Sequence, residues 1–186
     1  MFAAAEKGKL NVVKWLYEKY SDKCTTVAMD AAAEAGQLET VKWLYFNRTE
    51  GCTIAAMDRA AACGHFEVVK WLHFNRSEGC TTFAIDRVGQ RQFDLQIRSS
   101  RVACKTPAAV HDNQLAIVQW LHANRSEGFT RLAVEGLALT GNLKLLQWLH
   151  DNSNARCSKR AMDFVAGSGD LGVVKWLHVH GTEGCT

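Results

Sequence analysis

Hydrophobic and polar positions along this chain follow a pattern that repeats, and each repeat has room for two short helices. In the segment 25–52, apolar residues recur at helical spacing on both sides of Gly36. Thr25 is a favourable N-cap for a first helix over 27–35, and a glycine is suited to ending such a helix. A second helix over 38–46 is expected to bury an apolar face. Two helices of this length are marginal alone, so the pattern predicts that they stack against neighbouring pairs.

Tryptophan marks the period of the repeat. Successive tryptophans are 28 residues apart, except for one interval of 49: Trp15, Trp43, Trp71, Trp120, Trp148 and Trp176. A leucine follows each tryptophan, and a threonine or serine stands ten residues after it. A fixed period of this size predicts a stacked array. The predicted units are 1–24, 25–52, 53–80, 81–129, 130–157 and 158–186. Since the pattern starts inside a first helix and stops on a cap, we expect the chain to be a piece of a longer array.

The string Ala-Ala-Ala-Cys-Gly-His-Phe-Glu-Val-Val-Lys-Trp-Leu at 60–72 resembles the core of the ankyrin repeat family. The family's Thr-Pro-Leu-His start is replaced by Ala-Met-Asp at 28–30, 56–58 and 161–163, and the unit is shorter than the standard length of about 33 residues. The resemblance implies an all-α solenoid of stacked helix-turn-helix units with β-hairpin fingers reduced or absent. It also implies a non-catalytic scaffold that binds another protein on its concave, first-helix face.

An acidic column lies in the early turns of the predicted first helices: Asp30, Asp58, Asp86, Glu135 and Asp163. The preferred interpretation is that these carboxylates complement the dipole of their own helix. The alternative is an acidic ladder on the surface that meets the partner. The residues that follow the column differ between units, as expected of a surface that packing does not fix. The predicted contact residues are therefore Asp30, Ala31, Asp58, Arg59, Glu135, Gly136, Asp163 and Phe164.

The long tryptophan interval contains an irregular insertion over 87–107, inside the fourth unit. It has five basic residues and one acidic residue, a charge of +4, against +3 for the whole chain. Pro107, the only proline, is expected to prevent a helix from running through it. Three interpretations remain open: a surface loop, which is preferred, a translated short intron, or a basic segment that binds nucleic acid or another acidic partner. The last is the alternative function, and an enzyme with a pocket beneath the insertion is a third hypothesis.

Other motifs do not indicate a cofactor, a metal or catalysis. Gly-Ser-Gly-Asp-Leu-Gly at 167–172 matches a dinucleotide-binding pattern, but the second glycine is the turn glycine of the repeat and no strand is expected before it. Cysteine recurs nine residues after most tryptophans, where Phe129 replaces it once, as suits a small buried apolar site. Histidine shares a column with Tyr17 and Tyr45, which favours a half-buried ring with a polar tip.

The composition is that of an ordinary soluble domain: 186 residues, 47% hydrophobic and 22% charged. No apolar run approaches the roughly 20 residues of a membrane span, and the first residues do not resemble a signal peptide. We therefore expect an intracellular protein, with its cysteines reduced. The small net charge makes a nucleic-acid partner unexpected, and no small-molecule substrate is indicated.

Overall fold

The computed structural model describes residues 1–20, 26–47, 51–77, 79–86, 88, 107–126, 128–152 and 158–180, and in these residues the regular structure is entirely helical. The helices are α1 (Phe2–Glu6), α2 (Leu10–Lys19), α3 (Thr26–Glu34), α4 (Leu38–Asn47), α5 (Ile54–Ala62), α6 (Phe66–Asn75), α8 (Pro107–Asn124), α9 (Arg131–Thr140), α10 (Leu143–Asp151), α11 (Lys159–Ser168) and α12 (Leu171–His180). The helices predicted over 27–35 and 38–46 are confirmed as α3 and α4. The described loops contain no strand, in agreement with the reduced fingers that were predicted.

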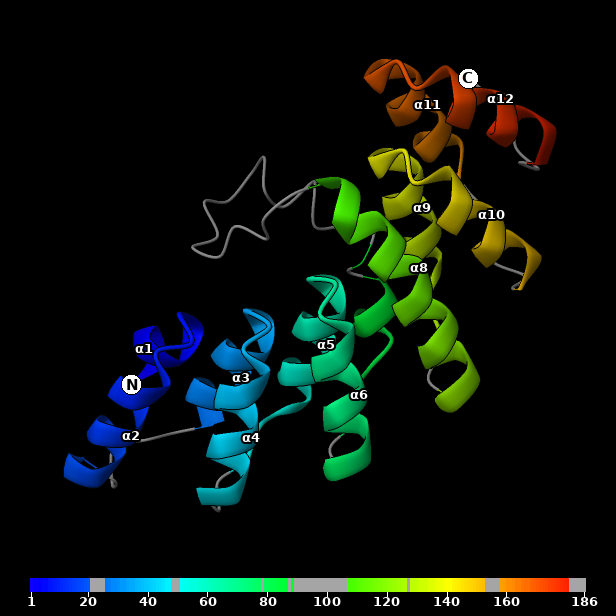
Figure 1. Cartoon of the computed structure of the whole chain (residues 1–186). Coiled ribbons are helices and arrows are strands. Elements are labelled where there is room, and N and C mark those ends of the chain that lie inside the picture. Colours follow the sequence, from blue (N-terminus) through cyan, green and yellow to red (C-terminus); the bar gives the residue numbers. More distant parts are fainter. Residues whose placement is uncertain are drawn as a thin grey trace.

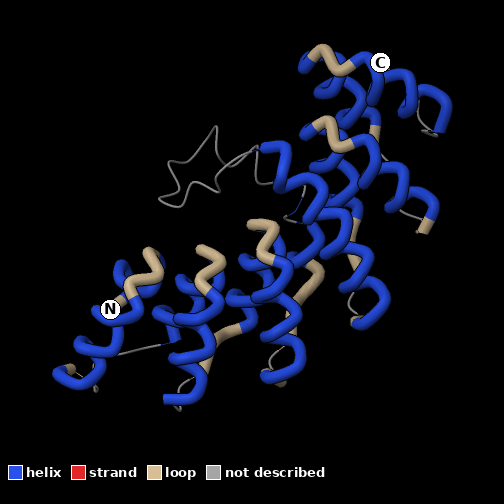
Figure 2. Tube along the Cα trace, viewed as in Figure 1, coloured by secondary structure: helices blue, strands red, loops and turns tan. Residues whose placement is uncertain are grey.

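The helices form two parallel rows that bend into an arc (Figures 1 and 2). The first helix of each pair packs against the first helix of its neighbours, as α3 does against α1 and α5, and α9 does against α11. This row lies on the inside of the arc, and the second helices α2, α4, α6, α10 and α12 lie on the outside (Figure 1). The two rows bury a common core between them, which includes Met29, Leu44, Met57, Leu72 and Leu149.

Each described cap that was predicted for a first helix is confirmed. The side chain of Thr53 accepts a hydrogen bond from the backbone nitrogen of Ala55, and Thr130 and Ser158 do the same at the starts of α9 and α11. The turn glycines end these helices, and Gly36 has a φ of +73°, in the left-handed region. A side chain at this position would also overlap the ring of His65 from the following unit. Glycine is therefore required here both by the turn and by the close approach of the next pair.

The fourth unit differs from the prediction. The pattern predicts a turn at Asn113, in the column of the turn glycines, but α8 runs without a break through this position. Asparagine tolerates the left-handed conformation but does not demand it, and no glycine interrupts α8. Pro107 is the first residue of α8, where its fixed φ and missing N–H are tolerated. The insertion predicted over 87–107 lies outside the described residues, apart from Val88 and Pro107.

Large apolar side chains such as the repeated tryptophans are expected in the core, and the structure corrects this expectation. Trp43, Trp71, Trp120, Trp148 and Trp176 are only partly buried and pack on the edge of the core. Trp15, in the first unit, is 53% exposed. The fully buried positions of the second helices are instead taken by aliphatic residues such as Leu44 and Leu72. A tryptophan ring is too large to be enclosed by helices of only ten residues, so it lies across the junction between units.

Candidate interaction surface

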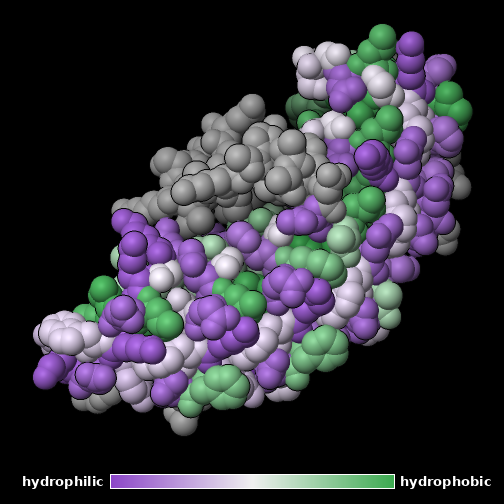
Figure 3. Space-filling model, viewed as in Figure 1, coloured by the Kyte–Doolittle hydropathy of each residue, from purple (hydrophilic) through white to green (hydrophobic). Residues whose placement is uncertain are grey.

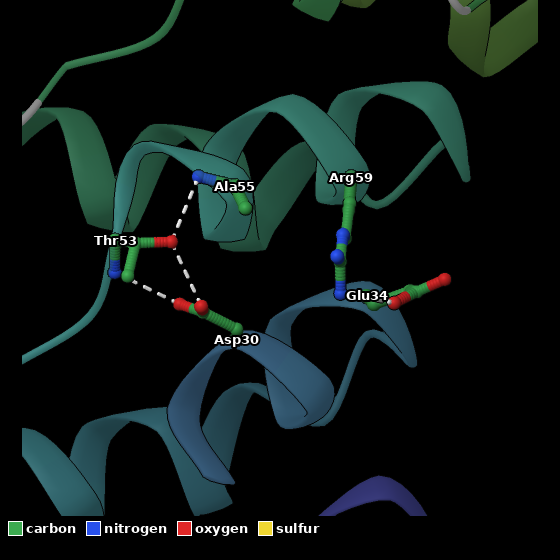
Figure 4. Close-up of polar contacts among 5 residues, drawn as sticks. All are labelled: Asp30, Glu34, Thr53, Ala55 and Arg59. Atoms are coloured by element: carbon green, nitrogen blue, oxygen red, sulfur yellow. Dashed lines mark hydrogen bonds and ion pairs between the residues drawn. The ribbon is translucent and has the colours of Figure 1, made fainter. Parts of the chain in front are cut away.

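At three junctions, a buried carboxylate joins a first helix to the next one. Asp30 in α3 is 7% exposed and accepts two hydrogen bonds from Thr53, at 2.9 Å from the backbone nitrogen and 2.8 Å from Oγ1 (Figure 4). Thr53 Oγ1 in turn accepts a hydrogen bond from Ala55 at 3.1 Å, at the start of α5. The carboxylate therefore supports the cap at the positive end of the next helix, where a negative charge is favourable. We call this arrangement the Asp–Thr clamp.

The clamp recurs at two further junctions. Asp58 accepts hydrogen bonds from Thr81, both at 2.8 Å, and Asp86 accepts them from Thr130, at 2.8 and 2.7 Å. The last of these spans the insertion and closes the stack across it. Asp58 is 7% and Asp86 1% exposed, so the acidic column is an internal element of the array in these units.

The positions of these aspartates correct the sequence-based interpretation. Both Asp30 and Asp58 were predicted contact residues, but they are buried against the next unit and are not accessible to a partner. The preferred interpretation, in which they complement the dipole of their own helix, did not include the main contact of these carboxylates, because each accepts hydrogen bonds from the threonine at the start of the following helix. The spacing of 23 residues between aspartate and threonine recurs in the sequence and is the signal that was missed.

The other predicted contact residues divide into three groups. Ala31 and Gly136 are buried in the first-helix row, so they too are excluded from a contact surface. Arg59, Asp163 and Phe164 are exposed. Glu135 is half-buried, and its carboxylate pairs with Arg131 in the same helix at 2.7 Å, in contrast to the aspartates of the clamp.

The first helices also expose apolar side chains that the sequence analysis did not single out. Val27, Ile54, Phe83 and Leu132 are each between 45 and 49% exposed, and all lie near the start of a first helix. Arg59 in α5 forms an ion pair with Glu34 in α3, with Nη1 and Oε2 3.1 Å apart (Figure 4). We define the first-helix surface by the exposed side chains Val27, Ile54, Arg59, Phe83, Leu132, Asp163 and Phe164.

The second helices expose a different set of apolar residues. Phe46 and Phe74, near the C-terminal ends of α4 and α6, are 74 and 73% exposed. Figure 3 shows apolar surface at the edge of the molecule where these helices end, and further apolar patches along the row from α8 to α12. These two phenylalanines are on the outer row and provide matched controls for the first-helix surface.

A ladder of rings links the second helices. The residue two positions after each tryptophan packs edge to face on the tryptophan of the next unit, with ring centroids 4.8 to 5.4 Å apart. The pairs are Tyr17–Trp43, Tyr45–Trp71, His73–Trp120, His122–Trp148 and His150–Trp176. The hydroxyl of Tyr17 donates a hydrogen bond to the carbonyl of Asn47 at 2.7 Å. The exchange of tyrosine for histidine is thus explained by the packing of a ring with a polar tip, as predicted.

The described cysteines are structural. Cys52, Cys63 and Cys80 are buried, which confirms the prediction of small apolar sites at these positions. Cys24, Cys157 and Cys185 lie outside the described residues. Over the described ranges, no group of three or more histidine, cysteine, aspartate or glutamate side chains is arranged to hold a metal ion.

Stacked helix pairs joined by recurrent contacts place the chain in the class of helical solenoids. The family described as ankyrin repeats in many copies matches the chain twice, over residues 1–45 and 29–73. The match covers residues 1–73, which therefore consist of ankyrin repeats, and the helix pairs of the later units stack in the same arrangement up to His180. Comparison with curated proteins finds none that matches the chain. In the residues that the structure describes, no helix has the length and apolar character required to cross a membrane.

Proposed function

We propose that this protein is a non-catalytic scaffold that binds another protein through the first-helix surface. Ankyrin repeats generally mediate protein–protein interaction, which gives the class of function. The observation that supports this particular surface is a contrast between two neighbouring positions of the repeat, one constant and buried and the other variable and exposed. The aspartates of the clamp recur in three units and are buried, while exposed residues in the next column differ, as Arg59 and Phe164 do. Variation at exposed positions on a constant frame is typical of a surface that is adapted to a partner.

The chemistry of the surface indicates the kind of partner. Its exposed side chains are mostly apolar, and the Glu34–Arg59 ion pair lies among them. Apolar side chains bordered by charges are typical of a protein interface, where the centre is desolvated and the rim stays polar. We propose a protein segment with apolar side chains as the ligand, held along the inside of the arc, and we propose that the chain itself catalyses no reaction.

The experiment uses site-specific photo-crosslinking on intact chains. A photoreactive phenylalanine analogue replaces Phe83 or Phe164 on the first-helix surface, and Phe46 or Phe74 on the outer row in matched controls. All four side chains are at least about half exposed, so the probe is accessible at each position. We expect the same protein to be crosslinked from a cell lysate by the first two probes and not by the controls.

A charge reversal then tests the contribution of a single side chain. Arg59→Glu breaks the pair with Glu34 at the surface and is expected to weaken capture of the crosslinked protein while the helical content stays unchanged. Reversing the charge of Asp30 or Asp58 is unsuitable as a test of binding, because it breaks a clamp and destabilises the stack itself. Crosslinking from Phe46 and Phe74 alone would place the interface on the outer row and refute the proposal. Capture that is lost at high salt and on deletion of 87–107 would support the basic insertion as the binding element instead.

A further inference from the structure

One position near the end of each second helix carries a side chain that caps the helix. It stands four residues after the tryptophan, and four successive units have asparagine there: Asn47, Asn75, Asn124 and Asn152. In each of these units the amide nitrogen donates a hydrogen bond to the carbonyl of the tryptophan, at 2.8 Å. The sixth unit has His180 at this position, and its Nδ1 lies 3.0 Å from the carbonyl of Trp176. A histidine therefore makes the cap that asparagine makes elsewhere.

The bond to the carbonyl determines which nitrogen of His180 carries the proton. A carbonyl only accepts hydrogen bonds, so Nδ1 is the donor and the neutral ring has its lone pair on Nε2. The ring also stacks on the indole of Trp176, with centroids 4.7 Å apart and an angle of 15° between the planes. A ring N–H that donates to a backbone carbonyl is the usual companion of a metal-binding histidine, because this bond orients the other nitrogen toward the ion.

A second imidazole reaches His180 from the neighbouring helix. The residue two positions after each tryptophan lies beside the cap of the next unit, as the hydrogen bond from Tyr17 to the carbonyl of Asn47 shows. At the junction before the last unit this residue is His150 in α10, and its ring centroid is 5.6 Å from that of His180. The ring of His150 also packs edge to face on Trp176. Along the sequence, these two positions are both histidine only here, because the earlier units have asparagine at the cap.

Both rings are accessible to an ion in solution, and this does not follow from where the sequence ends. His150 is half-buried in the fifth unit, and His180 is exposed. The asparagines that correspond to His180 are also exposed in units that have a neighbour on each side, as Asn47 and Asn124 are. The contact between the two histidines depends only on the fifth and sixth units, which the structure describes.

We propose that His150 and His180 form a binding site for Zn²⁺ or a chemically similar divalent transition-metal ion, for which imidazole is a preferred ligand. Two imidazoles on one tetrahedral zinc ion, with Zn–N bonds of about 2.0–2.1 Å, have ring centroids about 5 Å apart. The separation of 5.6 Å in the structure is close to this value. We expect a rotation of the His150 side chain to bring its nitrogen onto the ion that Nε2 of His180 binds, with water in the remaining coordination positions.

An ion at this site would join the fifth and sixth units. The acidic column carries Glu135 at this junction, and its carboxylate pairs with Arg131 of its own helix. Since the two ligands come from α10 and α12, the ion binds both of them only while these helices are stacked, and it therefore stabilises the folded array as its concentration rises. The site lies on the second helices, so the inference does not depend on the proposed function.

The test measures binding of Zn²⁺ to the intact, metal-free chain by isothermal titration calorimetry. The repeat itself supplies variants that remove one ligand and keep the fold. His180→Asn restores the cap of the four preceding units, and His150→Tyr restores the ring that Tyr17 and Tyr45 place against the next tryptophan. Each variant is expected to stay folded and to bind Zn²⁺ at least about tenfold more weakly than the original chain. Where one of the two loses helix by circular dichroism, the other carries the test.

His122→Tyr is the matched control, because it makes the same exchange at a junction where the cap is Asn152. It should bind Zn²⁺ as the original chain does, and it retains the same cysteine thiols as the other variants. Thermal unfolding gives a second measurement: Zn²⁺ is expected to raise the midpoint of the original chain and of the control, and to leave that of His180→Asn unchanged. Equal affinity of the original chain and both ligand variants would overturn the proposal, because the ion would then lie on other groups. So would the absence of binding by the original chain, or an equal loss in the control.

Discussion

The carboxylate of Asp30 holds the hydroxyl and the backbone nitrogen of Thr53, the residue that caps the next first helix. This one contact couples the start of a helix to the unit before it. Since the same contact recurs at Asp58 and Asp86, the array is joined by a polar element as well as by its apolar core. The stability of each unit thus depends on its neighbour in a way that substitution can measure.

The first prediction concerns the clamp. Asp30→Ala removes two hydrogen bonds to a charged, buried group and is expected to lower the free energy of unfolding by about 2–3 kcal/mol. Chemical denaturation of Asp30→Ala, Thr53→Ala and the double variant measures the coupling, expected to be about 1–2 kcal/mol. A coupling energy near zero would show that the contact contributes nothing beyond the separate residues.

The second prediction concerns the fifth unit, where the column carries glutamate. Glu135 pairs with Arg131 of its own helix, and Ser158 caps the next one. Glu135→Asp shortens the side chain to the length found in the clamps, and with Ser158→Thr it is expected to raise the free energy of unfolding by about 0.5–1 kcal/mol. Glu135→Gln with Ser158→Thr is the control, because it keeps the longer chain and removes the charge. Equal stability of the two double variants would contradict the prediction.

The third prediction compares two turn glycines. Gly36 and Gly169 have φ values of +73° and +79°, but a Cβ on Gly36 would overlap the ring of His65, whereas one on Gly169 would meet nothing within 4 Å. Gly169→Ala is expected to cost about 1 kcal/mol, from the backbone conformation alone. Gly36→Ala is expected to cost about 2–3 kcal/mol, because it adds a clash to the same strain. Thermal unfolding of both variants checks the order, and equal losses would show that His65 moves aside freely.

The fourth prediction compares two tryptophans. Trp43 packs on Tyr17 with ring centroids 5.4 Å apart and is partly buried, whereas Trp15 is 53% exposed. Trp43→Ala is expected to lower the free energy of unfolding by about 2–4 kcal/mol, somewhat less than the roughly 3–5 kcal/mol of a tryptophan in a closed core, because the ring is only partly buried. Trp15→Ala is expected to cost less than about 1 kcal/mol, because the ring is largely in solvent. Denaturant titrations that give the two variants the same midpoint would contradict the ladder as a source of stability.

The sequence predicted the elements that depend on position within one unit. The caps Thr53 and Thr130, the turn at Gly36 and the ends of α4 follow from local preferences that act over a few residues. A period of 28 then places the same elements along the array, and the family resemblance gives their packing.

What the sequence did not predict depends on contacts between units. Periodicity indicates that Asp30 and Thr53 occupy fixed columns, but it does not indicate that the side chain of one reaches the other across a junction. For the same reason it did not distinguish a buried tryptophan from one that lies across two units. Asn113 shows a further limit, because asparagine is compatible with both a turn and a helix, and in the structure it lies within α8. The predicted contact residues therefore included Asp30 and Asp58, which the next unit covers, and the binding face itself stays a proposal.

The clamp between Asp86 and Thr130 has a consequence for the insertion that precedes α8. It joins the units on either side, together with the hydrogen bond from Gln114 Nε2 to the carbonyl of Val88 at 3.2 Å and the packing of His73 on Trp120. These contacts between described residues set the register of the stack before and after the insertion. Doubling the length of such a connection costs only about 0.6 kcal/mol in closure entropy. The array accordingly has a position where foreign sequence can be grafted, or native sequence removed, while the repeats before and after it stay in phase.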